Sequence, residues 1–226
     1  MVQTAAPLPA GRALERRREI LRAASLAFRA RGFHAAGMRE IADALGMTVG
    51  NLYYYFASKQ DLLAFCQEDT LHRLLQLVRW VRARELRADE RLRLVVVGHV
   101  CTLNEATPGS LAHLEVEALP PAARRRILAR RDRYQRALRD IVAEGTRARV
   151  FRAVDPQVAA LALLGAVNWT VRWFRPEGPA TPRAIGAQMA EHLVRGLLAP
   201  GVELRLSRLM VPCFAGLADP PEMEQP

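Results

Sequence analysis

The stretch MREIADALGMTVGNLYYYFASKQDLL, residues 38–63, decides the fold of this chain. Its apolar positions predict a short helix over residues 38–45 and a second short helix over residues 49–56. Gly46 lies between them and allows the left-handed backbone that a tight turn needs, while Thr48 is a suitable N-cap for the second helix. A short helix, a glycine-containing turn and another short helix together predict a helix-turn-helix.

The segments on either side extend this motif. Residues 12–30 predict an amphipathic helix with an apolar stripe on one face and arginines on the other, ended by Gly32. Ser58 and Asp61 form a near capping box at the start of a long helix that extends to about residue 83. The motif is therefore expected to supply the second and third helices of a three-helix domain, and a long fourth helix follows it.

The rest of the chain predicts further helices and shows no strand alternation. These helices are expected over residues 89–105, 111–118, 122–148, 156–174 and 182–198. We therefore predict an all-α fold of about nine helices, with an N-terminal helix-turn-helix domain and a C-terminal antiparallel helical domain. The expected boundaries are a disordered arm over residues 1–11, the helix-turn-helix domain over 12–57, the second domain over 58–200 and a tail over 201–226.

Composition narrows the class of partner. The 226 residues include 33 Lys and Arg against 23 Asp and Glu, a net charge of +10 carried almost entirely by arginine. This excess favours a polyanionic partner, nucleic acid ahead of an anionic membrane surface, although a GC-rich genome also enriches arginine. The three cysteines show no metal-binding spacing, and no apolar run reaches the roughly 20 residues that cross a bilayer. We expect a soluble, cytoplasmic protein that uses no metal or cofactor and does not enter a membrane.

The exposed positions of the motif are candidates for DNA contact. Three adjacent tyrosines cannot all be buried on a short helix, and their hydroxyls suit phosphate oxygens while their rings suit thymine methyls and sugars. Lys59 lies at a helix N-terminus, which already favours phosphate, and Arg39 can reach the backbone or a base edge. The predicted DNA-binding residues are Arg39, Thr48, Gly50, Asn51, Tyr53, Tyr54, Tyr55 and Lys59. An alternative places Tyr55 in the core beside Phe56.

The same stretch resembles the tetracycline-repressor (TetR) family of transcriptional regulators over roughly residues 13 to 65. The matching residues are Arg39, Ile41, Ala42, Leu45-Gly46, the LYYYF run of residues 52–56, Ser58-Lys59 and Leu62-Leu63. One departure is Gly37, where the family usually has a capping Thr or Ser. The resemblance implies a regulator, more often a repressor than an activator, that binds a palindromic operator as a dimer. Enzyme motifs such as a metal triad, a Gly-rich phosphate loop or a nucleophile motif are lacking, so no catalytic activity is expected.

The resemblance also implies that the second domain, residues 58–200, dimerises and binds an effector. Helix 156–174 is apolar almost all round, so it must be buried on more than one side, and the family pairs it and helix 182–198 with those of a second copy. Residues 165–197 resemble the branch that senses CoA thioesters, either fatty acyl-CoA or the CoA esters of sterol-ring breakdown, and releases the operator on binding. Arginines would hold the CoA phosphates and apolar residues the acyl group. The predicted effector-binding residues are Val100, Leu103, Asn104, Leu114, Arg133, Arg136, Trp169, Arg172 and Trp173.

Several alternatives remain open at this point. Trp169 and Trp173 are equally well explained as core or dimer-interface aromatics. His99 is better explained as a core or surface histidine with satisfied hydrogen bonds than as a ligand contact. The arginine run of residues 124–133 fits a solvated helix face better than a phosphate site. The effector could be a different hydrophobic or aromatic compound, as in drug-efflux control, or the chain could be a DNA-binding protein that takes no ligand.

Overall fold

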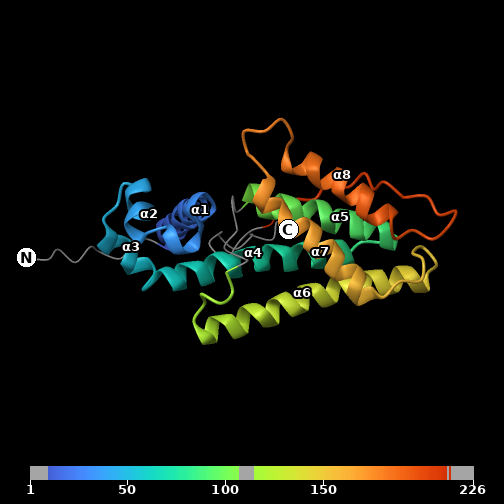
Figure 1. The fold of residues 1–226 in the computed structure, drawn as a ribbon, viewed down its shortest axis with the longest axis horizontal. Helices are drawn as coiled ribbons and strands as arrows, with labels where there is room; N and C mark the ends of the chain where they lie inside the picture. Colours follow the sequence, from blue (N-terminus) through green and yellow to red (C-terminus); the bar gives the residue numbers. More distant parts are fainter. Residues whose placement is uncertain (1–9, 107–114, 213, 215–226) are drawn as a thin grey trace, which may run out of the picture.

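A computed structural model describes residues 10–106, 115–212 and 214 of the chain (Figure 1). Within them it contains eight α-helices and one π-helix, so the predicted all-α fold is confirmed. The helices are α1 (Ala10–Ala35), α2 (Met38–Ala44), α3 (Val49–Tyr55), α4 (Lys59–Arg82), α5 (Ala88–Cys101), the π-helix η1 (Thr102–Ala106), α6 (Pro121–Arg147), α7 (Pro156–Trp173) and α8 (Pro182–Arg195). Among the described residues no helix is both long and apolar enough to cross a membrane.

Helices α1, α2 and α3 form a compact head at one end of an elongated body (Figure 1). The core of the head continues into α4 and the start of α6, and in it Ile20, Phe28, Ile41 and Leu52 are fully buried. The turn and cap predicted from the sequence are present, since Gly46 has a φ of 60° and the Thr48 hydroxyl accepts a hydrogen bond from the Asn51 N–H at 3.2 Å. Local sequence signals therefore fix the geometry of the helix-turn-helix.

The N-terminal caps of α2 and α4 differ in strength. Gly37 precedes α2 in an extended conformation and offers no side-chain cap, whereas the Ser58 hydroxyl accepts from the Asp61 N–H at 3.0 Å.

In α1 the backbone leaves the helical region at Gly32, whose φ is 76°, as expected for a stop signal. The chain then makes one further turn to Ala35 before α2 begins.

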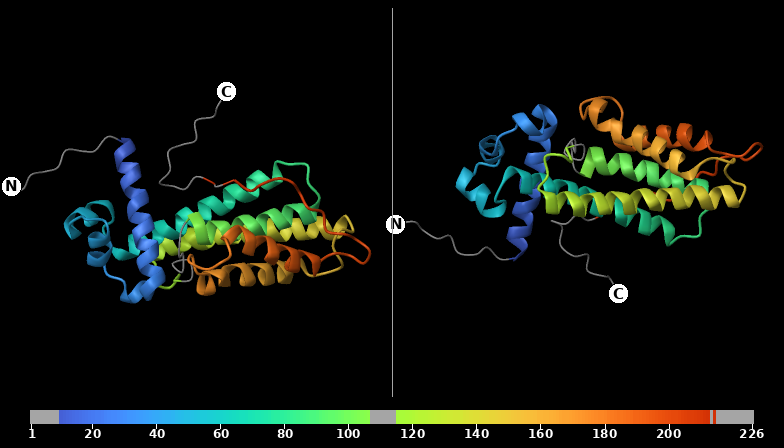
Figure 2. Two further views of the ribbon diagram at one scale, coloured as in Figure 1. Left: turned by 90° about the horizontal axis from the view of Figure 1, so that it is seen from above. Right: turned by 60° about the horizontal axis from the view of Figure 1, so that its bottom comes forward.

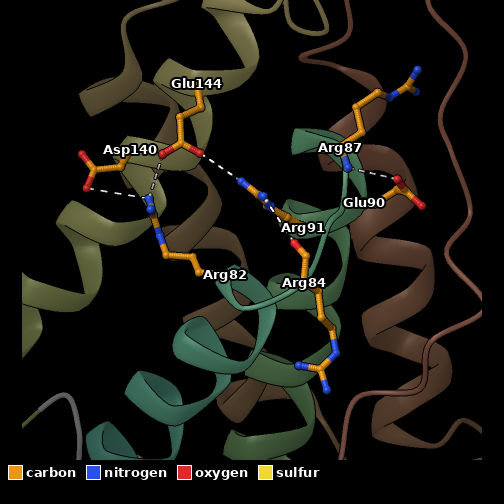
Figure 3. Close-up of polar contacts among 7 residues, drawn as sticks. All are labelled: Arg82, Arg84, Arg87, Glu90, Arg91, Asp140 and Glu144. Carbon is orange, nitrogen blue, oxygen red and sulfur yellow. Dashed lines mark hydrogen bonds and ion pairs between the residues drawn. The ribbon is translucent and has the colours of Figure 1, made fainter.

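Helices α4 to α8 form the body, with α5 packed among α4, α6, α7 and α8. The approach of α5 and α8 depends on a glycine, because a Cβ atom on Gly186 would lie 3.1 Å from the Cα of Val97. At the end of the body far from the head, Glu144 of α6 accepts hydrogen bonds from Arg82 of α4 at 3.2 Å and from Arg91 of α5 at 3.1 Å (Figure 3). This carboxylate therefore joins three helices where the chain turns from α4 into α5.

Two predicted helices differ from the structure. The helix expected over residues 111–118 is absent at residues 115–118, which form a loop and turn, while residues 111–114 lie outside the described part. Pro120 explains this, because a proline disfavours helical backbone in the residue before it, and α6 then begins at Pro121. The helix expected over 89–105 ends as an α-helix at Cys101 and continues as η1.

The chain does not end with α8 but returns along the body as an extended C-terminal segment, residues 199–212 (Figure 2, red). Val211 of this segment is buried. A Cβ atom on Gly98 of α5 would lie 2.7 Å from the Leu77 side chain of α4 and 2.9 Å from Val211, so a glycine at this position allows both neighbours to approach. The segment is also fixed by polar contacts, since the Arg205 N–H donates to the buried carboxylate of Asp89 at 2.9 Å. That carboxylate also accepts from the Arg87 guanidinium at 2.6 Å.

Candidate DNA-binding surface and the polar cluster of the body

Helix α3 is held to the head by one buried side chain and presents its remaining surface outward. Leu52 is completely buried, whereas Thr48, Gly50 and Asn51 are exposed. Tyr53 is 47% exposed and Tyr54 is 76% exposed, so these rings do not stabilise the core. An exposed helix face with two aromatic rings and small polar residues can enter a groove and contact phosphates and base edges.

The third tyrosine has a different environment. Tyr55 is half-buried and packs against the core of the head, with its ring perpendicular to that of Tyr54 at 5.4 Å between centroids. The structure therefore separates the three tyrosines that the sequence grouped together. Arg39, at the start of α2, is exposed on the head as well.

Lys59 makes contacts that its sequence position did not indicate. Its ammonium donates to the backbone carbonyls of Phe33 at 2.8 Å, His34 at 3.1 Å and Ala36 at 2.9 Å. It also lies 4.5 Å from the centre of the Phe33 ring. An ammonium has three N–H donors, and here all three have a partner at the C-terminal end of α1. A phosphate contact by Lys59 stays a prediction, and the structure adds a role in joining α4 to α1.

The body contains a set of polar side chains that we call the polar cluster: His99, Asn104, Tyr134 and Thr170 are buried, and Asn168 is half-buried. The His99 ring contacts the Tyr134 hydroxyl at 2.9 Å and the Asn168 amide oxygen at 3.0 Å, so the interpretation of His99 as a satisfied core histidine is confirmed. Burial raises the pKa of Tyr134 far above its usual value, which keeps its hydroxyl neutral. Sequence reasoning missed Tyr134, Asn168 and Thr170, because each lies on a helix whose pattern otherwise predicts a simple apolar face.

Asn104 is the member of this cluster with an unused atom. Its amide nitrogen donates to the Val100 carbonyl and to the Thr170 hydroxyl, both at 2.9 Å. Its Oδ1 atom is buried and has no hydrogen-bond partner in the described part of the chain. Because a buried amide oxygen without a partner costs about 1–3 kcal/mol, this atom is available to a ligand that donates a hydrogen bond.

The predicted effector-binding residues fall into three separate places. Val100 and Leu103 are buried beside Asn104, Leu114 lies outside the described residues, and Arg133 and Arg136 are exposed on α6. Trp169, Arg172 and Trp173 lie on the exposed face of α7. The single chain therefore does not bring the two tryptophans together with the buried end of α5.

The exposed face of α7 is apolar along its length. We call the following residues the α7 stripe: Val158, Leu161, Trp169 and Trp173, which are 61%, 48%, 60% and 46% exposed. Their spacing of three, eight and four residues keeps them on one side of the helix. The Arg172 guanidinium lies 5.8 Å from the centre of the Trp169 ring. Large apolar side chains in such a row mark an interaction surface.

A cavity of about 770 Å³ lies elsewhere, beside α1. Its walls come from α1, from the end of α2 and from Arg73 of α4, and they include the charged residues Glu15, Arg18, Glu19, Arg22 and Glu40. None of the predicted effector-binding residues lines it. Its mixed charge does not match a single class of ligand.

Comparison with known proteins identifies both halves of the chain. Residues 20–65 match the family model described as bacterial regulatory proteins, tetR family, and residues 85–197 match that of the tetracyclin repressor-like C-terminal domain. The HTH-type transcriptional repressor KstR2 of Rhodococcus jostii is 30% identical over 192 residues, which cover 82% of this chain and 92% of the relative.

Two solved structures are similar over most of the chain. The TetR family transcriptional regulator PfmR from Thermus thermophilus has 30% sequence identity and a TM-score of 0.71, covering 78% of this chain and 97% of PfmR. AibR, solved in complex with isovaleryl coenzyme A and operator DNA, has 28% identity and a TM-score of 0.69, covering 82% of this chain and 99% of AibR.

Proposed function

The chain belongs to the TetR family of transcriptional regulators, and from this premise we propose that it is a repressor that a CoA thioester releases from DNA. In this proposal a homodimer binds a palindromic operator through residues 12–57 of each copy. Residues 58–200 form the part that dimerises and binds the effector. The family membership itself makes the protein a regulator of transcription and not an enzyme.

The observation that carries the dimeric part of the proposal is the α7 stripe. A monomer leaves four large apolar side chains in water along one helix, at a cost of about 25 cal/mol for each Å² of apolar surface that stays exposed. A second copy would cover both stripes at once, because a two-fold axis brings the same surface of each chain together. Helix α8 follows α7 directly and would complete the interface, with helices 156–174 and 182–198 of each chain forming four helices in contact.

The proposed DNA surface is α3 together with Arg39 at the start of α2. Thr48, Gly50, Asn51 and Tyr53 are assigned to base edges, with Tyr54, Tyr55 and Lys59 on phosphates. A dimer presents two such surfaces, so its half-sites should lie about one helical turn or a multiple apart. For Lys59 the phosphate contact would have to be made with an ammonium that already has three carbonyl partners.

The proposed effector site is the polar cluster with the apolar residues around it. AibR binds isovaleryl coenzyme A and operator DNA, which supports a CoA thioester as the ligand class. Val100 and Leu103 would contact the acyl group, and the free Oδ1 of Asn104 would accept a hydrogen bond. Arg133, Arg136 and Arg172 are assigned to the phosphates, whereas Trp169 and Trp173 fit the dimer interface better than the effector.

The test is operator release measured with a panel of ligands. DNA that the protein selects from a random library would be labelled, and its dissociation followed during addition of isovaleryl-CoA, palmitoyl-CoA or free CoA. We expect at least one acyl-CoA to release the DNA at micromolar concentration, and free CoA to have little effect. The variant Asn104→Leu should keep operator binding and lose the response. If every acyl-CoA leaves the complex intact at high micromolar concentration, the proposed effector class is wrong.

A further inference from the structure

Helix α1 of the head contacts the C-terminal end of α7 through one arginine. The Arg29 guanidinium donates a hydrogen bond to the carbonyl of Phe174, the residue that caps α7, and lies 5.5 Å from the centre of the Phe174 ring. Phe174 is buried, although it follows the last residue of the helix. A cation at a helix C-terminus is favoured by the helix dipole and by the unpaired carbonyls there.

The contact places Arg29 in surroundings that are unfavourable for a charge. One of its terminal nitrogens, Nη1, is buried without a hydrogen-bond partner in the described part of the chain. Loss of solvent lowers the pKa of Arg29, the neighbouring Arg175 lowers it further, and Glu177 opposes the shift. A long, flexible side chain would be expected to turn toward water from such a position, so its orientation toward Phe174 points to a specific contact between α1 and the end of α7.

The two elements joined by Arg29 have separate tasks in the proposed function. Helix α1 packs on α2 and on the start of α4 and shares its core with α3, so it supports the DNA-binding surface directly. Helix α7 runs toward the head and carries the α7 stripe, so it is fixed relative to the second copy (Figures 1 and 2). Arg29 is thus a direct contact between the DNA-binding unit and the helix at the dimer interface.

We propose that Arg29 is a positioning residue that fixes the angle between head and α7, and thereby determines which half-site spacing the dimer accepts. The inference rests on the proposed dimer and palindromic operator. Inserting one base pair between half-sites moves one of them by about 3.4 Å and turns it by about a tenth of a helical turn. A dimer with rigidly held heads cannot follow that movement, whereas heads released from α7 can.

The test compares the affinity of the protein for operators that differ only in spacing. The selected operator would be rebuilt with its half-sites moved apart or together by one and two base pairs. The wild-type protein should prefer its own spacing by at least about 10-fold over a change of one base pair. Arg29→Met, which keeps the apolar length of the side chain, should reduce this preference to about 3-fold or less, and Arg29→Lys should recover part of it.

The matched control is Arg22→Met, because Arg22 lies two turns earlier on the same face of α1 and is exposed. Both variants lose one positive charge and should lose general DNA affinity to a similar extent, but only Arg29→Met should lose the preference for spacing. A melting temperature within a few degrees of the wild-type value would show that Arg29→Met still folds.

The outcomes separate a failure of the proposed dimer from a failure of the role assigned to Arg29. If the wild-type protein selects DNA without two spaced half-sites, or is monomeric by light scattering, the proposed dimeric function fails and the role of Arg29 fails with it. If the wild-type preference is sharp and Arg29→Met retains it, only the role of Arg29 is overturned. The role of Arg29 is also overturned if Arg22→Met loses the spacing preference to the same extent as Arg29→Met.

Discussion

The head and the body each have a buried apolar core, but they offer different kinds of surface to a partner. In the head, apolar side chains such as Leu52 are buried and polar ones such as Asn51 are exposed. In the body, the polar cluster is largely buried while the apolar α7 stripe is exposed. The head shares its core with α4 and the start of α6 and offers an exposed face that suits DNA, whereas the body has one surface that suits a second copy and one buried acceptor that suits a ligand.

This difference also explains how much could be predicted from the sequence. The head depends on neighbours in the chain, such as the Thr48 cap, the Gly46 turn and the Ser58 cap, and all three were predicted correctly. The helices of the body were located to within a few residues, except over 111–118. Contacts between residues that lie far apart in the chain could not be predicted from the sequence. Asn104 reaches Thr170, 66 residues later, and Arg205 reaches Asp89, 116 residues earlier, and no local pattern marks either pair.

The largest expected effect tests whether the body is incomplete as a monomer. A glutamate at the centre of the α7 stripe, Trp169→Glu, would place a charge in the apolar interface. Because two linked half-site contacts bind about 10²–10⁴-fold more tightly than one, operator affinity should fall by at least about 100-fold. Light scattering should show a monomer. The control is Ala129→Glu, on the exposed face of α6, which should remain dimeric. If Trp169→Glu also remains dimeric, the interface lies elsewhere.

A second prediction concerns the buried carboxylate of the body. Asp89 is fully buried and accepts hydrogen bonds from Arg87 and from the Arg205 N–H. Asp89→Asn should lower the free energy of unfolding by about 2–3 kcal/mol, because charge-assisted bonds are lost and the C-terminal segment is no longer fixed. Urea denaturation measures this change. The control is Glu90→Gln. Glu90 lies beside Asp89 in the first turn of α5 but is more exposed, so this change should lower the free energy of unfolding by less than half as much.

The same carboxylate predicts how stability depends on pH. Burial alone would raise the pKa of Asp89, but the hydrogen bonds from Arg87 and Arg205 outweigh it and the pKa is lowered. A lowered pKa in the folded state means that the carboxylate stabilises the protein above its unfolded pKa of about 3.9, and that this contribution is lost as pH falls through the folded value. The stability gap between wild type and Asp89→Asn should therefore be constant near neutral pH and shrink below about pH 4. A gap that widens on acidification would contradict this assignment.

A third prediction tests whether the exposed face of the head serves DNA and not folding. Tyr54 is 76% exposed, so Tyr54→Ala should leave the melting temperature within about 2 °C of the wild-type value. Operator affinity should fall by about 10-fold and by a similar factor on unrelated DNA, as expected for a phosphate contact. Tyr55→Ala is the comparison, because Tyr55 is half-buried and its loss should lower the melting temperature. Equal operator affinity of Tyr54→Ala and wild type would remove Tyr54 from the interface.

The smallest expected effect separates the two roles of Lys59, a DNA contact and a contact that joins α4 to α1. Lys59→Met keeps much of the side-chain length and removes donors from three carbonyls at the end of α1. Lys59 is half-buried, so solvent weakens these bonds, and we expect a loss of about 1 kcal/mol in the free energy of unfolding. The measured quantity is the slope of the logarithm of operator affinity against the logarithm of salt concentration. If the ammonium is held by the carbonyls alone, this slope should be the same for Lys59→Met and for the wild type. If it also neutralises a phosphate, the slope should fall by about 0.9. A changed slope together with a loss of stability would show that Lys59 contacts α1 in the free protein and phosphate on the operator, whereas a changed slope without a loss of stability would assign Lys59 to DNA alone.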